Sequence, residues 1–352
     1  GVGSYQLSIG PRWRESAARA FLRPALKRPN LKVLSHSLAS KVLIKDRRAT
    51  GVVWRTSGRS FLATARREVI LSCGAIQTPQ LLQLSGVGPS AHLQKHGIPV
   101  RDNLPGVGEN LQDHYQVRTI LKLKQRISLN DAVRSPIGLT KMALQWAING
   151  TGPLTVGAGQ VGGSALSEHA DGNRPDLQFM VMPMSVPKPG EPLHRFSGFT
   201  SVVYHCHPKS RGRIRIQSPG PESEPLIQPN YLAEEIDQKT LVSGIKMLRA
   251  IHAQSAFSKL VNSEFLPGPE TVSDADLLNF ARENGSTFFH PCGTCKMGED
   301  GMAVVDPELR VRGIDSLRII DASIIPTIPS ANVNATVYMI AEKGASMVLN
   351  HG

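Results

Sequence analysis

The sequence predicts an α/β protein of two domains, one built on a parallel sheet and one, of α+β type, built on an antiparallel sheet. A length of 352 residues suits two domains, and 40% hydrophobic with 19% charged residues is an ordinary globular composition. Two short apolar runs, 68–72 and 317–320, each precede a turn and a helical pattern, as buried parallel strands do. Between them, strands and helices follow without strict strand–helix–strand order, which indicates the α+β domain.

In the first part of the chain, period-two alternation and short apolar runs predict strands, with a tight turn at 45–48. These expected strands are residues 31–34, 40–44, 51–54 and 68–72. A helix is expected to open at Thr78-Pro79, because threonine is a good N-cap and proline suits the first turn. We expect it to end at Ser85-Gly86.

The rest of the chain shows both periodicities. Helical spacing predicts helices at 137–148, 236–255 and 333–349. Alternation and apolar runs predict strands at 177–182, 201–205, 213–216 and 317–320.

Charge and cysteine content limit the partners and the compartment. The net charge is +12, but the basic residues are spread out, so we expect no nucleic-acid partner and a weak attraction to an anionic membrane surface. No apolar run approaches the roughly 20 residues that span a bilayer. The four cysteines are too few for a disulfide scaffold. We therefore expect a cytoplasmic protein, peripheral at most to the inner membrane.

Two glycine patterns superficially fit a dinucleotide-binding loop. The pattern Gly86-x-Gly88-x-x-Ala91 follows a predicted helix, whereas the fingerprint requires a preceding strand. The pattern Gly157-x-Gly159-x-x-Gly162 has no acidic residue about 20 positions later for a ribose. We interpret the first as a turn and the second as a flexible loop.

The segment that begins at His290 holds two cysteines and a histidine. Cys292-x-x-Cys295 lacks the further ligands of a zinc site and lies too near the C-terminus for a thioredoxin-like motif. We expect no metal and interpret both cysteines as packing residues. A lone histidine is more often structural than catalytic, although His290 stands in a polar loop, where catalytic residues concentrate.

Several long segments, in the right order, resemble the glucose–methanol–choline oxidoreductase family over essentially the whole chain. These are SCGAIQTPQLLQLSGVG (72–88), LPGVGENLQDH (104–114), SRGRIRI (210–216), PNYL (229–232), HPCGTCKMG (290–298), VVDPELRVRGIDSLRIIDASIIPT (304–327) and NVNATVYMIAEK (332–343). The resemblance is strongest to the bacterial alcohol and choline dehydrogenase branch. It implies a Rossmann-like FAD-binding domain and a substrate domain with an antiparallel sheet.

The resemblance also implies FAD as cofactor and oxidation of an alcohol to an aldehyde or ketone, with a hydride passing to flavin N5. The base that takes the hydroxyl proton would be His290, and a pKa near neutrality suits that task. Its partner would be Asn332, whose amide can donate to the alcohol oxygen but cannot act as a base. A turn or N-cap before the last helix is the structural alternative for Asn332.

Five further residues are implied as cofactor-binding by the same resemblance: Val42, Ala75, Asp321, Ala322 and Asn334. The backbones of Val42 and Ala75 would meet the adenosine half of FAD. Asp321 and Ala322 end a predicted strand, where open α/β sheets bind ligands, although an Asx-turn at Asp321 is the simpler interpretation. Asn334 would lie beside the isoalloxazine ring.

The implied domain bounds are 28–113 and 290–352 for FAD binding and 114–289 for substrate, with 1–27 crossing between them. The family's N-terminal strand–helix–strand unit, with its G-x-G-x-x-G loop, does not precede these motifs, and the chain begins with glycine. We therefore expect a fragment that binds FAD poorly by itself, because a helix N-terminus for the pyrophosphate would be missing.

Two alternative functions remain open. The first is choline dehydrogenation. Aromatic residues make up only 5% of the chain, and GPLTVGAGQVGG (152–163) offers no aromatic or acidic residue to a quaternary ammonium, so we favour an uncharged alcohol. The second is an inactive, flavin-free remnant. The electron acceptor stays open.

Overall fold

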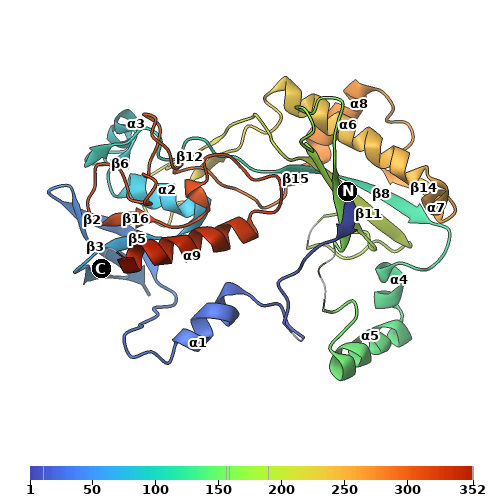
Figure 1. The fold of residues 1–352 in the computed structure, drawn as a ribbon, viewed down its shortest axis with the longest axis horizontal. Coiled ribbons are helices and arrows are strands. Elements are labelled where there is room, and N and C mark those ends of the chain that lie inside the picture. Colours follow the sequence, from blue (N-terminus) through green and yellow to red (C-terminus); the bar gives the residue numbers. More distant parts are fainter. Residues whose placement is uncertain (11, 156, 158, 189, 351–352) are drawn as a thin grey trace. The chain divides into compact units, whose positions relative to one another are not determined.

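The chain divides into two compact units. The structure, a computed structural model, describes residues 1–350 apart from 11, 156, 158 and 189. Unit 1 comprises Gly1–Val33, Tyr115–His205 and Glu235–Ser286. Unit 2 comprises Leu34–His114, Cys206–Glu234 and Thr287–Gly352 (Figure 1).

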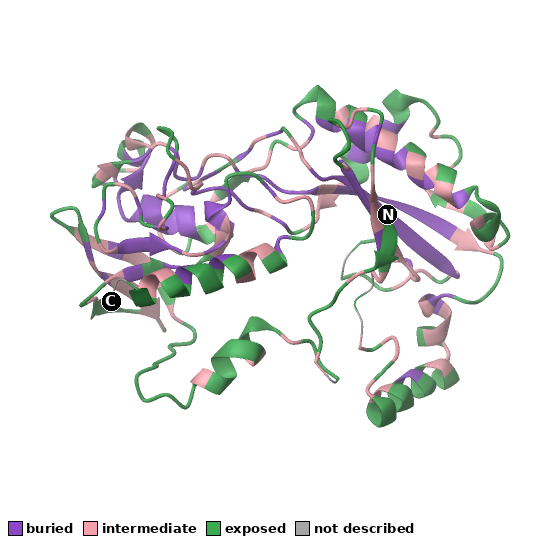
Figure 2. Ribbon diagram, viewed as in Figure 1, coloured by how far each residue is buried: buried purple, intermediate pink, exposed green. Residues whose placement is uncertain are grey.

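Unit 1 is built on an antiparallel sheet with the strand order β1-β9-β10-β11-β8-β14, and β15 also pairs with β8. The strands are β1 (Val2–Ser4), β8 (Tyr115–Leu123), β9 (Val161–Ala165), β10 (Leu177–Met182), β11 (Gly198–His205), β14 (Val261–Leu266) and β15 (Ser286–Thr287). The central strands are almost wholly buried, as the purple arrows of Figure 2 show.

Helices pack against this sheet. The longest, α6 (Glu235–His252), packs on β11, where a Cβ at Gly244 would stand 2.7 Å from Val203 Cγ2. Glycine therefore permits the close approach of helix and sheet. The other helices of the unit are a π-helical turn (Ala18–Leu22), α1 (Arg23–Ala25), α4 (Leu129–Arg134), α5 (Pro136–Asn149), α7 (Ser255–Ser258) and α8 (Asp274–Asn284).

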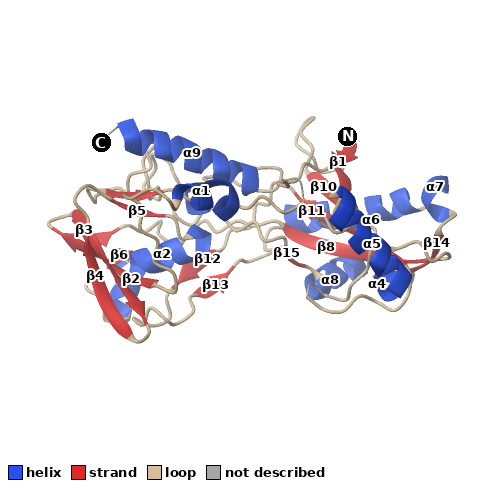
Figure 3. Cartoon of the chain, turned by 90° about the horizontal axis from the view of Figure 1, so that it is seen from below, coloured by secondary structure: helices blue, strands red, loops and turns tan. Residues whose placement is uncertain are grey.

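Unit 2 combines several small sheets around a large hydrophobic core, beside a smaller cluster of four buried residues (Figure 3). Strands β2 (Leu38–Lys45), β3 (Arg48–Thr56) and β4 (Arg59–Thr64) form an antiparallel sheet. Strands β5 (Val69–Leu71) and β16 (Leu317–Ile319) pair in parallel, so their carboxyl ends meet at one edge. The shorter pairs are β6 (Val87–Gly88) with β7 (Asp102–Asn103) and β12 (Arg213–Arg215) with β13 (Leu226–Gln228).

The helices of unit 2 are α2 (Gly74–Leu84), α3 (Ser90–Lys95), a 3-10 turn (Ala322–Ile324) and α9 (Asn334–Asn350). Helix α2 is buried over most of its length and begins four residues before the expected start at Thr78-Pro79, which is therefore wrong. Pro79 has no N–H to donate to the carbonyl of Ala75, and that carbonyl accepts from Thr294 Oγ instead, at 2.5 Å. A tertiary contact thus permits proline inside the helix.

Most expected elements of the chain are confirmed within a few residues, including β2, β3, β10, α5 and α9. The expected strand at 31–34 is wrong. These residues lie exposed, and no described strand pairs with them. An apolar run alone does not form a strand, because its backbone groups need a partner.

The compact units differ from the expected domain bounds in two places. Residues 206–234, expected in the substrate domain, pack with unit 2, because β12 contacts α2. Residues 1–33 belong to unit 1, where β1 pairs with β9.

Candidate active site

His290 stands at the end of a tight turn in unit 2. The preceding residue, Phe289, has a φ of 61°, which is unusual for a bulky side chain. Asp113 fixes this turn: its carboxylate accepts from the backbone N–H of His290 at 2.8 Å and from the hydroxyls of Thr287 and Tyr231. Several donors on one buried carboxylate hold the turn in a defined arrangement.

The His290 imidazole is held from several sides. Its Nδ1 lies 2.8 Å from Nδ1 of His114, and its Nε2 lies 3.0 Å from Nδ2 of Asn332. The rings of His114 and Phe288 both meet it edge-on, with centroids 5.1 and 4.9 Å away. The sequence-based pairing of His290 with Asn332 is thus reproduced as a contact between two side chains 42 residues apart in sequence.

Burial decides the charge of His290. The side chain is 7% exposed, and loss of water lowers its pKa to about 4. This pKa lies below the near-neutral value that suits a base at pH 7. At neutral pH the ring is uncharged, and one of its nitrogens is unprotonated and can accept a proton.

Asn332 reaches His290 from an exposed segment just before α9. Helix α9 begins at Asn334, so Asn332 lies two residues ahead of it and is not its N-cap. Asn334, the first residue of the helix, is exposed.

A second group of the expected residues gathers at the carboxyl ends of β5 and β16. The Asp321 carboxylate accepts from the Gly74 N–H at 3.0 Å and from the Thr78 hydroxyl at 2.6 Å, and it also accepts from Ser323 N–H at 2.8 Å. The last bond is the Asx-turn expected as the simpler interpretation. With its oxygens so engaged, Asp321 can offer a ligand its backbone rather than its charge.

The segment after His290 joins these two groups. Gly293 N–H donates to the carbonyl of Ala322 at 3.1 Å, and Thr294 donates to the carbonyl of Ala75. Gly293 has a φ of +88°, and a Cβ there would stand 2.7 Å from the carbonyl oxygen of Asn110, so glycine is required. Five residues of sequence thus connect the histidine with the strand ends.

Val42 is the outlying member of the expected set. It lies in β2, fully buried, and its N–H donates to Ser85 Oγ at 2.8 Å. That amide is therefore already engaged within the protein.

Cys292 and Cys295 are free thiols within the core of unit 2. Burial raises the pKa of Cys292 to about 12 and that of Cys295 further, so both stay protonated. Their burial supports the packing role.

Sequence reasoning missed Asp113 and His114. Both stand in LPGVGENLQDH, which resembles the family, but their position in the chain gave no sign of the 2.8 Å contacts with His290. Only the fold brings these two residues, which lie 176 and 177 positions from His290 in sequence, into contact with it.

Comparison with known proteins places these residues in a family context. Family models described as GMC oxidoreductase match residues 1–116 and 208–341. The chain is 40% identical to an alcohol dehydrogenase (acceptor) of Pseudomonas putida, over 99% of this chain and 63% of that protein. It is also 40% identical to an oxygen-dependent choline dehydrogenase of Burkholderia pseudomallei, over 100% of this chain and 62% of that protein.

Solved structures agree with these relatives. A formate oxidase of Aspergillus oryzae, studied for FAD modification, is 27% identical with a TM-score of 0.89, covering 98% of this chain and 64% of that one. A pyridoxine 4-oxidase from Mesorbium loti is 26% identical with a TM-score of 0.85, covering 100% of this chain and 65% of that one. The chain thus spans less than two thirds of the length of each of these four proteins.

Proposed function

Because the chain belongs to the GMC oxidoreductase family, we propose that it provides the proton-accepting site of an FAD-dependent enzyme that oxidises an alcohol to an aldehyde or ketone. One observation carries the proposal: His290 Nε2 and Asn332 Nδ2 lie 3.0 Å apart, a neutral base beside an amide donor. The two groups can address one hydroxyl oxygen. The contact between His290 and Asn332 argues against the alternative of an inactive, flavin-free remnant.

The two side chains would divide the work on the hydroxyl. His290 takes the hydroxyl proton on Nε2, while the Asn332 amide donates to the oxygen and holds it in place. Bound FAD supplies the acceptor for the hydride that leaves the carbinol carbon. The alcohol thereby loses one proton and one hydride, and its C–O bond becomes a carbonyl.

The residues at the strand ends fit a nucleotide cofactor. Open α/β sheets bind ligands beyond the carboxyl ends of parallel strands, and Ala75, Asp321 and Ala322 follow β5 and β16 there. At Gly74, with a φ of +83°, nothing lies within 4 Å of where a Cβ would be, so the backbone is open to a ligand. We propose that backbone groups of these residues hold FAD, with Asn334 nearer its ring. Val42 would have to contribute its carbonyl.

We propose an uncharged alcohol as substrate. The carboxylate next to His290 belongs to Asp113, which is buried and accepts several hydrogen bonds, so it is not presented to a cation. Choline is the alternative substrate, since a choline dehydrogenase is as similar to this chain as the alcohol dehydrogenase is.

The test is anaerobic reduction of the flavin in the full-length protein, followed by absorbance after mixing with a primary alcohol or with choline. We expect the uncharged alcohol to bleach the flavin at least about tenfold faster, since one unpaired cation in the site costs more than 1.4 kcal/mol. Faster reduction by choline would replace the proposed substrate. No reduction by any alcohol would contradict the proposed function itself.

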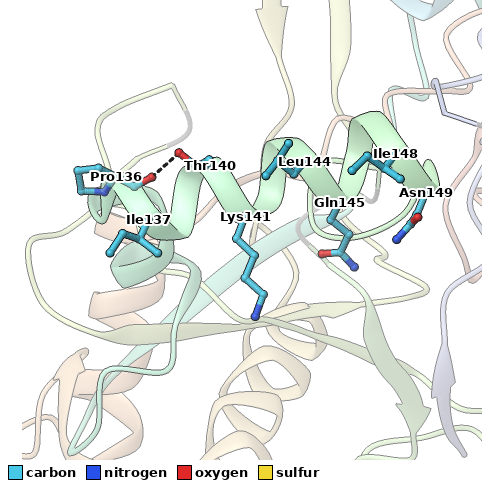
Figure 4. A pocket seen from close by; sticks show the side chains of 8 residues that line it. All are labelled: Pro136, Ile137, Thr140, Lys141, Leu144, Gln145, Ile148 and Asn149. Atoms are coloured by element: carbon cyan, nitrogen blue, oxygen red, sulfur yellow. Dashed lines mark hydrogen bonds between the residues drawn. The ribbon is translucent and has the colours of Figure 1, made fainter.

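A membrane surface is a second proposed partner. Along α5, Ile137 is 82% exposed, Leu144 53% and Ile148 69%, and Lys141 lies on the same stripe (Figure 4). A helix with an exposed apolar stripe can lie in the surface of a bilayer, and the single lysine, Lys141, can extend toward anionic headgroups. Among the described residues, no helix is both long and apolar enough to cross a membrane. We propose that α5 binds the surface of a cytoplasmic membrane leaflet.

Flotation of the full-length protein with vesicles tests this surface. We expect binding to phosphatidylglycerol vesicles, and a loss of at least about tenfold in Ile137→Glu/Ile148→Glu, because two exposed apolar anchors are removed. Val272→Glu, at an exposed loop position, is the matched control and should bind normally. Equal flotation of the double variant would contradict the proposal.

A further inference from the structure

The environment of His290 includes a second histidine to which the proposed reaction assigns no part. His114 is completely buried and stands between His290 and the backbone carbonyl of Cys206. Its Nδ1 lies 2.8 Å from His290 Nδ1, and its Nε2 lies 3.1 Å from the carbonyl oxygen. All of these groups belong to unit 2.

The carbonyl oxygen fixes the direction of every proton in this chain of contacts. A carbonyl can only accept, so His114 Nε2 must carry a hydrogen. A neutral imidazole carries a single hydrogen, so with that hydrogen on Nε2 the Nδ1 of His114 accepts. The shared contact then requires the hydrogen on His290 Nδ1, which leaves the lone pair of His290 on Nε2.

We propose that His114 is a positioning residue that holds His290 in the tautomer with an unprotonated Nε2, facing Asn332. The opposite tautomer would place a hydrogen on the atom that must accept the alcohol proton. The contact also serves the protonated form, because an imidazolium donates to His114 Nδ1 more strongly than a neutral ring does. This inference rests on the proposed function, yet the tautomer can be measured without turnover.

The contact of Asn332 with His290 is consistent with this placement of the hydrogens. With the lone pair on His290 Nε2, the Asn332 amide must present its N–H to the ring, and Nδ2 is the amide atom that faces it at 3.0 Å. An arriving hydroxyl can replace this contact by donating to Nε2 and accepting from the same amide. The chain of donors from His290 to Cys206 remains unchanged throughout.

The experiment uses the full-length, FAD-loaded enzyme labelled with ¹⁵N-histidine. The ¹⁵N chemical shift of a neutral ring nitrogen depends strongly on whether it carries the hydrogen, and loss of the signal in His290→Ala assigns it. In the unchanged enzyme we expect the hydrogen of His290 on Nδ1. A hydrogen on Nε2 would overturn the proposal without any variant.

Two variants separate positioning from mere packing. In His114→Phe the acceptor is lost, so we expect His290 to populate the other tautomer and flavin reduction to slow about 10–100-fold, with KM nearly unchanged. His114→Gln offers an acceptor and a donor at similar spacing, so it should restore the tautomer and most of the rate. His252→Phe, at a buried histidine bonded to Ser201 in unit 1, is the matched control.

The outcomes distinguish this inference from the proposed function. A folded, flavin-loaded His114→Phe with an unchanged tautomer and rate would overturn the inference alone. If His114→Phe does not fold, the tautomer in the unchanged enzyme and in His114→Gln still decides it. A normal reduction rate in His290→Ala, together with the expected tautomers, would instead overturn only the proposed function.

Discussion

Replacing His290 by alanine in the full-length enzyme should slow the reduction of bound flavin by alcohol about 10²–10⁴-fold, the usual effect of losing a general base. Bound FAD should remain, because the residues proposed to hold it, Ala75 and Ala322, bond to the backbone and to Thr294 rather than to the imidazole. Reoxidation by an acceptor dye should suffer less, since the base acts only while the alcohol is oxidised. Anaerobic stopped-flow absorbance measures both steps.

Two further variants sharpen this result. His290→Gln fills the same space but cannot take a proton, so it should be nearly as slow as alanine. His252→Ala removes another buried histidine, whose pKa burial also lowers to about 4, and should reduce flavin normally once folded. Near-normal reduction in His290→Ala would remove the histidine from the proposed mechanism.

The pH dependence of flavin reduction follows from the same burial. A base must be unprotonated, so the rate should fall as pH drops through about 4, the lowered pKa of His290, instead of through 6.5. Asp113 and His114 are titratable groups that contact it. The free energy of unfolding should also decrease as the pH falls. The unfolded chain binds the proton below pH 6.5 and the folded chain only below about 4, so the folded state loses stability as the pH drops through that interval. The pH dependence of stability in His290→Gln should lack this contribution of the histidine.

Replacing Asn332 by alanine should slow flavin reduction about 10²–10³-fold, as for the loss of one donor to a developing oxyanion. The amide contacts Nε2 of His290 directly and cannot itself act as a base, so the effect should stay below that of His290→Ala. Stopped-flow reduction at saturating alcohol isolates the chemical step from weaker binding.

The matched variants for this position are Asn332→His and Asn262→Ala. Histidine keeps a ring N–H that can donate, so Asn332→His should retain more activity than alanine does. Asn262 is an exposed asparagine on β14 of unit 1, and its replacement should change nothing measurable. A smaller loss in Asn332→Ala than in Asn332→His would show that donation to the alcohol oxygen is not its task.

The sequence by itself indicated the family and most of the elements, and it named His290 and Asn332, whose side chains lie in contact, as a pair. The resemblance extends over long segments, and the periodicities are local properties that survive without tertiary context. Strand β10 and helix α5 illustrate this, since alternation and helical spacing predicted both nearly to the residue. The expected strand at 31–34 shows the limit, because pairing is not a local property.

Only the tertiary structure decided where α2 begins, how His290 is charged and what orients it. Thr294, which is distant in sequence, donates to the carbonyl of Ala75 the hydrogen bond that Pro79 cannot donate within the helix. Burial sets the pKa of His290, and burial depends on every segment packed around the ring. His114 reaches that ring across 176 residues of sequence. Such contacts are set by packing between distant segments, which no spacing along the chain encodes.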